Sequence, residues 1–153
     1  MKLTAFTDYS LRVLIFLAAQ PGRRCTIAEI AQAFDISANH LTKVVHFLGK
    51  HGWVATVRGK GGGMSLARPA QALHIGDIVR QTEGLDTPAE CFEPSGHCRI
   101  ARICRLRGVL AEAVDAFYEV LDRYTLDDLV ANRQGLAQVL FLDNATLQGA
   151  APT

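Results

Sequence analysis

Three of the four cysteines stand close together in the second half of the chain. Cys91, Cys98 and Cys104 fall within 14 residues and are separated by six and five residues. Zinc fingers supply their ligands in closely spaced pairs, which this segment lacks. Three thiolates at wide intervals can enclose a larger group, so we expect an iron-sulfur cluster here.

Two other chemistries fit the same cysteines. One is a zinc ion with His97 as a fourth ligand, and the other is a redox thiol switch without metal. Four basic residues lie between and directly after the last two of these cysteines: Arg99, Arg102, Arg105 and Arg107. Their positive charge offsets the negative charge of a thiolate-ligated cluster. The fourth cysteine, Cys25, stands alone and receives no role, because a single cysteine is most often a small buried hydrophobe.

A second group of residues suited to chemistry lies in a basic segment, residues 36–68. This segment contains five lysine and arginine residues and no acidic residue, so its net charge is +5. The net charge of the whole chain is +1, which leaves −4 for the remainder. Such an uneven distribution indicates a surface that binds a polyanion, although a solvated basic face produces the same pattern.

Two short helices joined by a tight turn are expected between residues 26 and 48. Thr26 and Glu29 form a capping-box pattern at the start of the first helix, and Ser37 is a natural cap for the second. The buried stripe of the second helix is Leu41, Val44, Val45 and Leu48. The positions left to face outward are of types that contact base edges and phosphates: Asn39, His40, Thr42, Lys43 and His46.

A basic hairpin is expected directly after these helices. Residues 53–57 are predicted to form a strand and residues 64–67 a return strand beside it. The loop between them is rich in glycine. Its two charged residues are Arg58 and Lys60, which would reach the neighbouring minor groove or its phosphates. A helix-turn-helix followed by a basic hairpin is a winged helix, which favours DNA binding over a plain solvated face.

The longest periodic segment follows the cysteines. Its apolar stripe is Leu106, Val109, Leu110, Ala113, Val114, Phe117, Tyr118 and Leu121. We expect the same helix of a second subunit to cover this stripe, while packing against the chain's own domain is the alternative.

The predicted fold is therefore mainly helical with a small β-hairpin wing, a winged helix-turn-helix plus a long dimerisation helix. We expect a winged-helix domain at 1–82 and a linker with the cluster-binding loop at 83–104. The dimerisation and C-terminal helices would occupy 105–143, and a flexible tail 144–153.

Composition excludes several classes of protein. With 153 residues, 49% hydrophobic and 20% charged, the chain is neither a large multidomain enzyme nor wholly disordered. No apolar run approaches the ~18 residues of a membrane span, and Asp8 and Arg12 interrupt any secretory signal pattern, so we expect a cytoplasmic protein without a membrane partner. No catalytic constellation or phosphate-binding loop is present, so we expect no enzyme.

Several segments together resemble the iron-sulfur winged-helix repressors, a family that includes NsrR-like nitric-oxide sensors and IscR-like regulators of cluster biogenesis. They are residues 3–9, 57–63, 104–106 and 124–130, and the likeness is greatest to the NsrR-like members. The resemblance implies that Cys91, Cys98 and Cys104 ligate the cluster. It also implies that the cluster is 4Fe-4S, although three cysteines and a carboxylate could hold 2Fe-2S.

The resemblance also bears on the fourth ligand. IscR-like members carry a histidine three residues after the last cysteine, where this chain has Arg107. NsrR-like members can use an aspartate from the other subunit, and Asp8 stands at the matching position. From the residues alone, Asp8 is a first-turn carboxylate that pairs with Arg12 four residues on. Both roles could alternate, so that Asp8 and Arg12 form a switch.

The implied function is that of a homodimeric repressor that binds a palindromic operator in double-stranded DNA. Nitric oxide is the implied signal, and nitrosylation of the cluster would release the DNA. Two alternatives stay open: a general iron-sulfur or redox-responsive regulator of the same fold, and a zinc or thiol protein with structural or redox cysteines.

Overall fold

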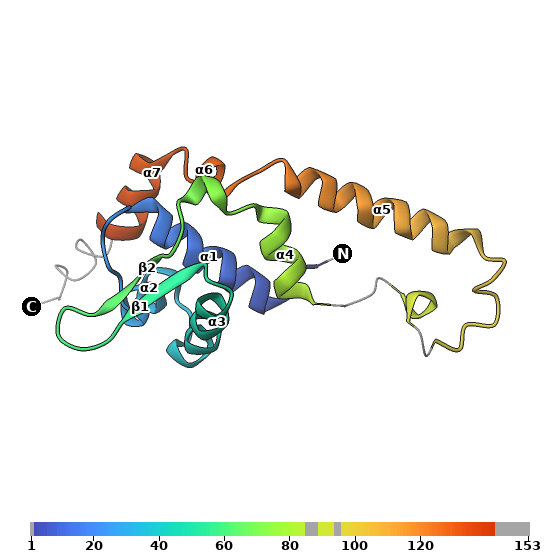
Figure 1. Ribbon diagram of the computed structural model, residues 1–153, viewed down its shortest axis with the longest axis horizontal. Coiled ribbons are helices and arrows are strands. Elements are labelled where there is room, and N and C mark those ends of the chain that lie inside the picture. Colours follow the sequence, from blue (N-terminus) through green and yellow to red (C-terminus); the bar gives the residue numbers. More distant parts are fainter. Residues whose placement is uncertain (1, 85–88, 94–95, 143–153) are drawn as a thin grey trace, which may run out of the picture.

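The protein is described by a computed structural model that covers residues 2–84, 89–93 and 96–142, and Figure 1 shows its elements. In order they are α1 (Ala5–Ala19), α2 (Ile27–Phe34), α3 (Ala38–Lys50), β1 (Val54–Val57), β2 (Gly63–Leu66), η1 (Ala70–Ala72), α4 (Ile75–Glu83), η2 (Glu90–Phe92), α5 (Arg105–Asp122), α6 (Leu126–Leu129), α7 (Arg133–Ala137) and the π-helical turn η3 (Gln138–Leu142). The predicted helical fold with one two-stranded hairpin is confirmed. The expected tail at 144–153 lies outside the described residues.

Helix α1 lies at the centre of the core. It contacts α2, α3, α4, α6, α7 and β2, and Val13 and Leu14 are fully buried. Its first turn is capped by the hydroxyl of Thr4, which accepts a hydrogen bond from the amide of Thr7 at 3.2 Å. Because α1 contacts nearly every other element of this domain, a displacement of α1 would also displace the elements packed against it.

The two helices α2 and α3 begin as the sequence indicates, with one exception. The capping box is present: the amide of Thr26 donates to Glu29 Oε2 at 2.7 Å, and the amide of Glu29 donates back to Thr26 Oγ1 at 3.3 Å. Ser37 occupies the cap position of α3, but its hydroxyl makes no capping bond, so that expectation is wrong. The side chain of Ser37 is exposed, and water can satisfy the first amides of α3 instead.

The hairpin is antiparallel, with Val54 opposite Leu66 and Val57 opposite Gly63. β1 begins one residue later than expected, at Val54, and β2 begins one residue earlier, because Gly63 already pairs with Val57. Cys25 adds a bridge on the other side of β2. Its amide donates to Met64 O at 2.9 Å and its carbonyl accepts from the Met64 amide at 2.7 Å, so the segment before α2 anchors the wing.

Helix α5 extends away from the rest of the molecule (Figure 1). Its last turn is fixed to α4 by Arg80, whose Nη1 and Nη2 each donate to an Asp122 carboxylate oxygen at 2.6 Å. Beyond α5 the chain returns to the core through the amide of Leu126, which donates to Leu73 O at 2.8 Å. The opposite end of α5 carries the cysteine segment.

The expected apolar stripe of α5 divides into two faces. Phe117, Tyr118 and Leu121 are partly buried and pack against the core of the chain itself. A second row along the helix is exposed: Leu106, Val109, Ala113, Ala116 and Val120. The alternative in which the helix packs on its own domain therefore holds for its C-terminal half, and the expectation that a second subunit covers the exposed row stays a prediction. Among the described residues, no helix has both the length and the hydropathy that a membrane crossing requires.

Candidate DNA-binding surface and cysteine site

The outward face of α3 has the composition that the sequence indicates. Its five candidate DNA-contacting side chains are all exposed: Asn39, His40, Thr42, Lys43 and His46. The hydroxyl of Thr42 donates to Ala38 O at 2.9 Å, which leaves its methyl group as the outward contact. The ring of His40 stacks on Tyr9 of α1, with 6.2 Å between centroids, a neighbour that sequence reasoning missed.

The orientation of α3 is set by α1. Leu41 and Leu48 of α3 are fully buried, and Phe47 meets Phe6 of α1 edge to face with 5.2 Å between ring centroids. Aromatic pairs of this geometry resist sliding because their contact is directional. The orientation of the outward face of α3 is therefore fixed by contacts with the first two turns of α1.

The loop of the wing presents Arg58 and Lys60, both exposed. Glycine is required around them. Gly59 and Gly61 have φ values of 93° and 75°, and a Cβ at Gly62 would lie 2.4 Å from Val57 O. The tight backbone thus holds two cations at the end of the hairpin, where they can reach phosphates beside the groove that α3 would enter.

The cysteine segment begins at η2, which contains Cys91, and ends at Cys104, the residue before α5. Cys98 lies between them, and all three thiols are free and partly buried. The guanidinium of Arg107 lies 5.7 Å from the ring centroid of Phe92, a contact between the start of α5 and η2. Within the described ranges, no three His, Cys, Asp or Glu side chains are grouped closely enough to hold a metal ion.

The donor set nevertheless fits an iron-sulfur cluster by its chemistry. Three soft thiol ligands, none engaged in a disulfide, lie in one segment next to Arg99, Arg102, Arg105 and Arg107. His97 is exposed, and its amide donates to Glu90 Oε1 at 3.0 Å. Cys25 differs from the other cysteines: burial raises the pKa of its thiol above the ordinary value, which disfavours the thiolate that a metal requires.

Asp8 and Arg12 form an ion pair on the surface of α1. Arg12 Nη2 lies 2.9 Å from Asp8 Oδ2, and Arg12 Nε donates to Asp8 Oδ1 at 3.1 Å. Both side chains are nearly half exposed, so Asp8 is accessible from outside the chain. The metal-binding role of Asp8 stays a prediction.

The end of α1 that carries Asp8 is joined to the end of α4 that leads toward the cysteines. The amide of Thr4 donates to Glu83 Oε1 at 2.9 Å, and the hydroxyl of Thr7 donates to Thr82 Oγ1 at 2.9 Å. Burial opposes ionisation of Glu83, but hydrogen bonds from Thr7 and Thr4 outweigh it and lower the pKa of this carboxyl. These contacts span more than 70 residues of sequence, and no local pattern indicated them.

Known proteins similar to this chain are transcriptional regulators. The chain matches the Rrf2 family, described as iron-dependent transcriptional regulators, over residues 3–132. The HTH-type transcriptional regulator NsrR of Bacillus subtilis strain 168 is 49% identical over 142 residues, which cover 92% of this chain and 97% of that protein.

Solved structures give the same assignment. The structure of CymR (YrzC), the global cysteine regulator of B. subtilis, has a TM-score of 0.70 and 32% identity, covering 86% of this chain and 98% of that one. The structure of T. potens IscR also has a TM-score of 0.70, with 27% identity and coverages of 86% and 87%. The expectation that the chain is not an enzyme is confirmed by these regulators. The chain belongs to the Rrf2 family of transcriptional regulators.

Proposed function

We propose that this chain is a cytoplasmic, homodimeric repressor that carries an iron-sulfur cluster and senses nitric oxide. One observation carries the proposal: three free thiols lie in the segment that ends where α5 begins, in a winged-helix chain 49% identical to NsrR. The surface of α3 and the hairpin binds a palindromic operator, and the outer row of α5 joins the two subunits.

The proposed ligands are Cys91, Cys98 and Cys104 of one subunit and Asp8 of the partner subunit. These residues would hold a 4Fe-4S cluster, whose iron would supply the site at which nitric oxide reacts. A carboxylate is a harder and poorer partner for such iron than a thiolate, so Asp8 would be the ligand most easily displaced. Arg12 Nη2 lies 2.9 Å from Asp8 Oδ2 and would donate hydrogen bonds to the released carboxylate.

The path from Asp8 to DNA runs through α1. Asp8 lies between Phe6 and Tyr9, which contact Phe47 and His40 of α3. A carboxylate held by the other subunit fixes α1, and through these contacts it fixes the separation of the two recognition helices. Release of Asp8 removes that constraint, and the operator affinity falls.

The test begins with protein purified without oxygen. Iron and sulfide analysis, absorption and Mössbauer spectra should reveal a cluster and distinguish 4Fe-4S from 2Fe-2S. A colourless protein would instead indicate zinc or an unmetallated thiol switch. Titration with nitric oxide, followed by fluorescence anisotropy of labelled operator DNA, should show affinity falling as the cluster spectrum changes.

Three comparisons make the test specific to the mechanism. Asp8→Ala should retain some cluster, because three thiolates remain, but should bind operator less tightly or respond differently to nitric oxide. Equal operator affinity with and without the cluster would contradict the proposal. A cluster that responds to oxygen or peroxide but not to nitric oxide would indicate a general redox regulator of the same fold.

A further inference from the structure

Arg24 is an exposed arginine in the turn that precedes α2, outside both α3 and the hairpin. Among the residues that the structure describes, it takes part in no ion pair, whereas the adjacent Arg23 pairs with Glu29. Its Nη1 donates instead to Gly61 O, in the loop of the wing, at 3.3 Å. The two residues are 37 positions apart in the sequence, so this contact ties the wing loop to the segment before α2.

The backbone beside Arg24 is fixed to β2. Cys25 exchanges two hydrogen bonds with Met64 of that strand, at 2.9 and 2.7 Å. Gly63 allows this close approach, because a Cβ at Gly63 would lie 3.2 Å from Arg24 Cβ and 3.0 Å from Cys25 O. The side chain of Arg24 therefore reaches the loop from a backbone whose position is set by the hairpin itself.

The loop that Arg24 contacts has few restraints of its own. Cross-strand pairing ends at Val57 and Gly63, and within the loop the amide of Gly62 donates to Gly59 O at 2.9 Å. Three of the five residues between the strands are glycines, which lose more conformational freedom on ordering than any other residue. A contact that already restrains Gly61 lowers the entropic cost of ordering this loop on DNA.

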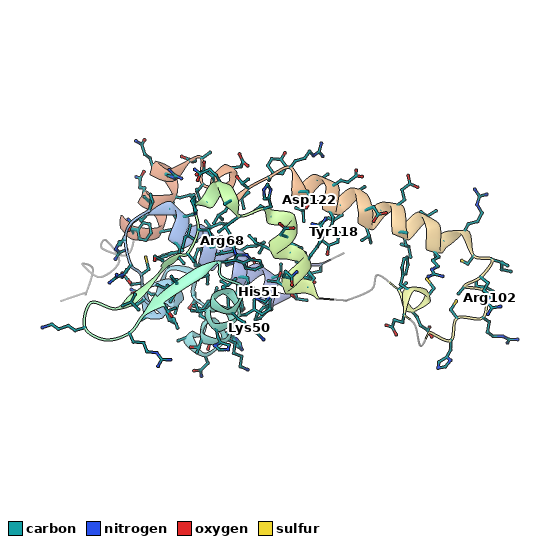
Figure 2. The ribbon with its side chains drawn as sticks, in the orientation of Figure 1. Lys50, His51, Arg68, Arg102, Tyr118 and Asp122 are labelled. Atoms are coloured by element: carbon teal, nitrogen blue, oxygen red, sulfur yellow. The ribbon has the colours of Figure 1, made fainter. Side chains whose placement is uncertain are left out.

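The charges at this end of the hairpin are all positive. Arg58 and Lys60 of the loop are exposed and, like Arg24, form no ion pair within the described part of the chain. Bringing unpaired cations together is unfavourable until an anion neutralises them, which favours contact with the DNA backbone. In Figure 2 the loop extends away from Lys50 and His51 and lies at the opposite end of the chain from Arg102, so it is remote from the cysteine segment of its own chain.

We infer that Arg24 is a positioning residue of the DNA-binding surface, which holds the wing loop in the conformation that places Lys60 against the DNA backbone. Arg24 acts through Lys60, because its hydrogen bond is made to the residue that directly follows Lys60. The inference rests on the proposed function in one respect only, that the wing binds DNA. It requires neither a cluster nor nitric oxide.

The experiment measures the affinity of the full chain for a selected operator by fluorescence anisotropy. Arg24→Gln should weaken binding about two- to tenfold, the range that the loss of one hydrogen bond produces. Arg23→Gln is the matched control, because it removes the same charge from the neighbouring residue, which pairs with Glu29; its affinity should equal wild type. Arg24→Lys keeps a charged donor and should retain most of the affinity. Equal losses in Arg23→Gln and Arg24→Gln would reveal a general effect of net charge and overturn the inference.

A double-mutant cycle separates positioning from a direct DNA contact. Added to Lys60→Ala, Arg24→Gln should cause little further loss, because the side chain that it positions is already absent. Added to Lys43→Ala in α3, it should cause its full loss, because that residue does not depend on the loop. A full loss in both backgrounds would mean that Arg24 contacts DNA by itself, which contradicts a positioning role.

The protein without DNA provides a second readout. The backbone order parameter of Gly61 should fall in Arg24→Gln and stay unchanged in Arg23→Gln. An unchanged order parameter in Arg24→Gln would overturn the inference even if DNA affinity fell. Weaker binding by Lys60→Ala with wild-type binding by Arg24→Gln would refute the role of Arg24 alone. Wild-type binding by Lys60→Ala would refute the role of the wing in the proposed function, and the role of Arg24 with it.

Discussion

Two regions of this molecule differ in how far their apolar side chains are exposed. In the body, which comprises residues 2–84 with α6 and α7, Val13, Leu14 and Leu41 are 0% exposed. In the arm, which comprises residues 89–122, Val109 is 60% exposed and Ile103 is 83% exposed. Both regions are rich in large aliphatic side chains, so composition does not separate them.

The difference lies in where the partner surface is found. Each buried side chain of the body meets others from the same chain, so the body can fold from its own sequence. Among the described residues of the arm, the outer row of α5 is exposed and the three thiols are free. Exposed apolar surface of this kind marks an interaction site. Under the proposed function, a second copy and a cluster would complete the arm, and the expectations below test that separation.

The largest effect should come from the cysteines. Replacing Cys91, Cys98 or Cys104 by Ala should abolish or strongly destabilise the cluster, whereas Cys25→Ala should retain it, because Cys25 is buried in the body beside Met64. The measurement is iron and sulfide content after anaerobic reconstitution. Full iron and sulfide in a variant that lacks all three arm cysteines would remove the arm as the cluster site.

Val109→Asp should dissociate the dimer. It places a charge within the exposed row of α5, where the second copy would have to bury it without a partner. The control is Asp115→Lys, which reverses a charge on the same helix outside that row. Analytical ultracentrifugation should give the monomer mass for the first variant and the dimer mass for the second. A dimer that survives Val109→Asp would place the subunit interface elsewhere.

Substitutions in the body should lower the free energy of unfolding, whereas substitutions in the exposed row of the arm should change dimer formation. Leu14→Ala removes a fully buried side chain and should cost about 2–5 kcal/mol of unfolding free energy. Leu106→Ala, at a position 57% exposed, should change it by no more than about 0.5 kcal/mol. Urea unfolding in the Val109→Asp background lets both values refer to the monomer. Similar losses in the two variants would show that the arm is as integral to the fold as the body.

DNA readout should belong to the body alone. Asn39→Ala should relax the base preference with a loss of about 1–3 kcal/mol if Asn39 makes a bidentate base contact, whereas Lys60→Ala should weaken specific and nonspecific DNA alike. Selection from a random DNA library, with anisotropy on the selected sites, separates the two effects. An unchanged preferred sequence for Asn39→Ala would exclude Asn39 from base recognition.

The sequence could predict features that depend on neighbouring residues, but not those that depend on contacts between distant segments. Local patterns were sufficient for the capping box at Thr26, the hairpin and the outward face of α3, because each depends on residues a few positions apart. They could not show the bridge of Cys25 to Met64, or the split of the α5 stripe into two faces. Those features depend on contacts between distant segments, such as Arg80 with Asp122. Under the proposed function, the arrangement of the three thiols would also depend on the bound cluster, which the chain does not encode.

The smallest effect should come from the joint between the two regions. Arg80 donates two hydrogen bonds to Asp122 and lies 4.5 Å from the ring centroid of Tyr118, so it fixes the base of the arm to α4. The hydrogen bond from Arg80 lowers the pKa of Asp122 below its ordinary value of 3.8. A carboxyl whose pKa is lower in the folded state contributes stability above the ordinary pKa and loses it as the pH falls through the folded value.

Asp122→Asn should therefore lower the Tm slightly at neutral pH, because the pair is exposed and screened by solvent. The difference from wild type should vanish once the pH lies below the folded pKa of Asp122, where the wild-type carboxyl is itself protonated. Asp115→Asn, on the same helix but outside any ion pair among the described residues, should show no such pH dependence. A Tm difference for Asp122→Asn that persists at acid pH would mean that packing of Tyr118 and Leu121, and not the charge pair, joins the arm to the body.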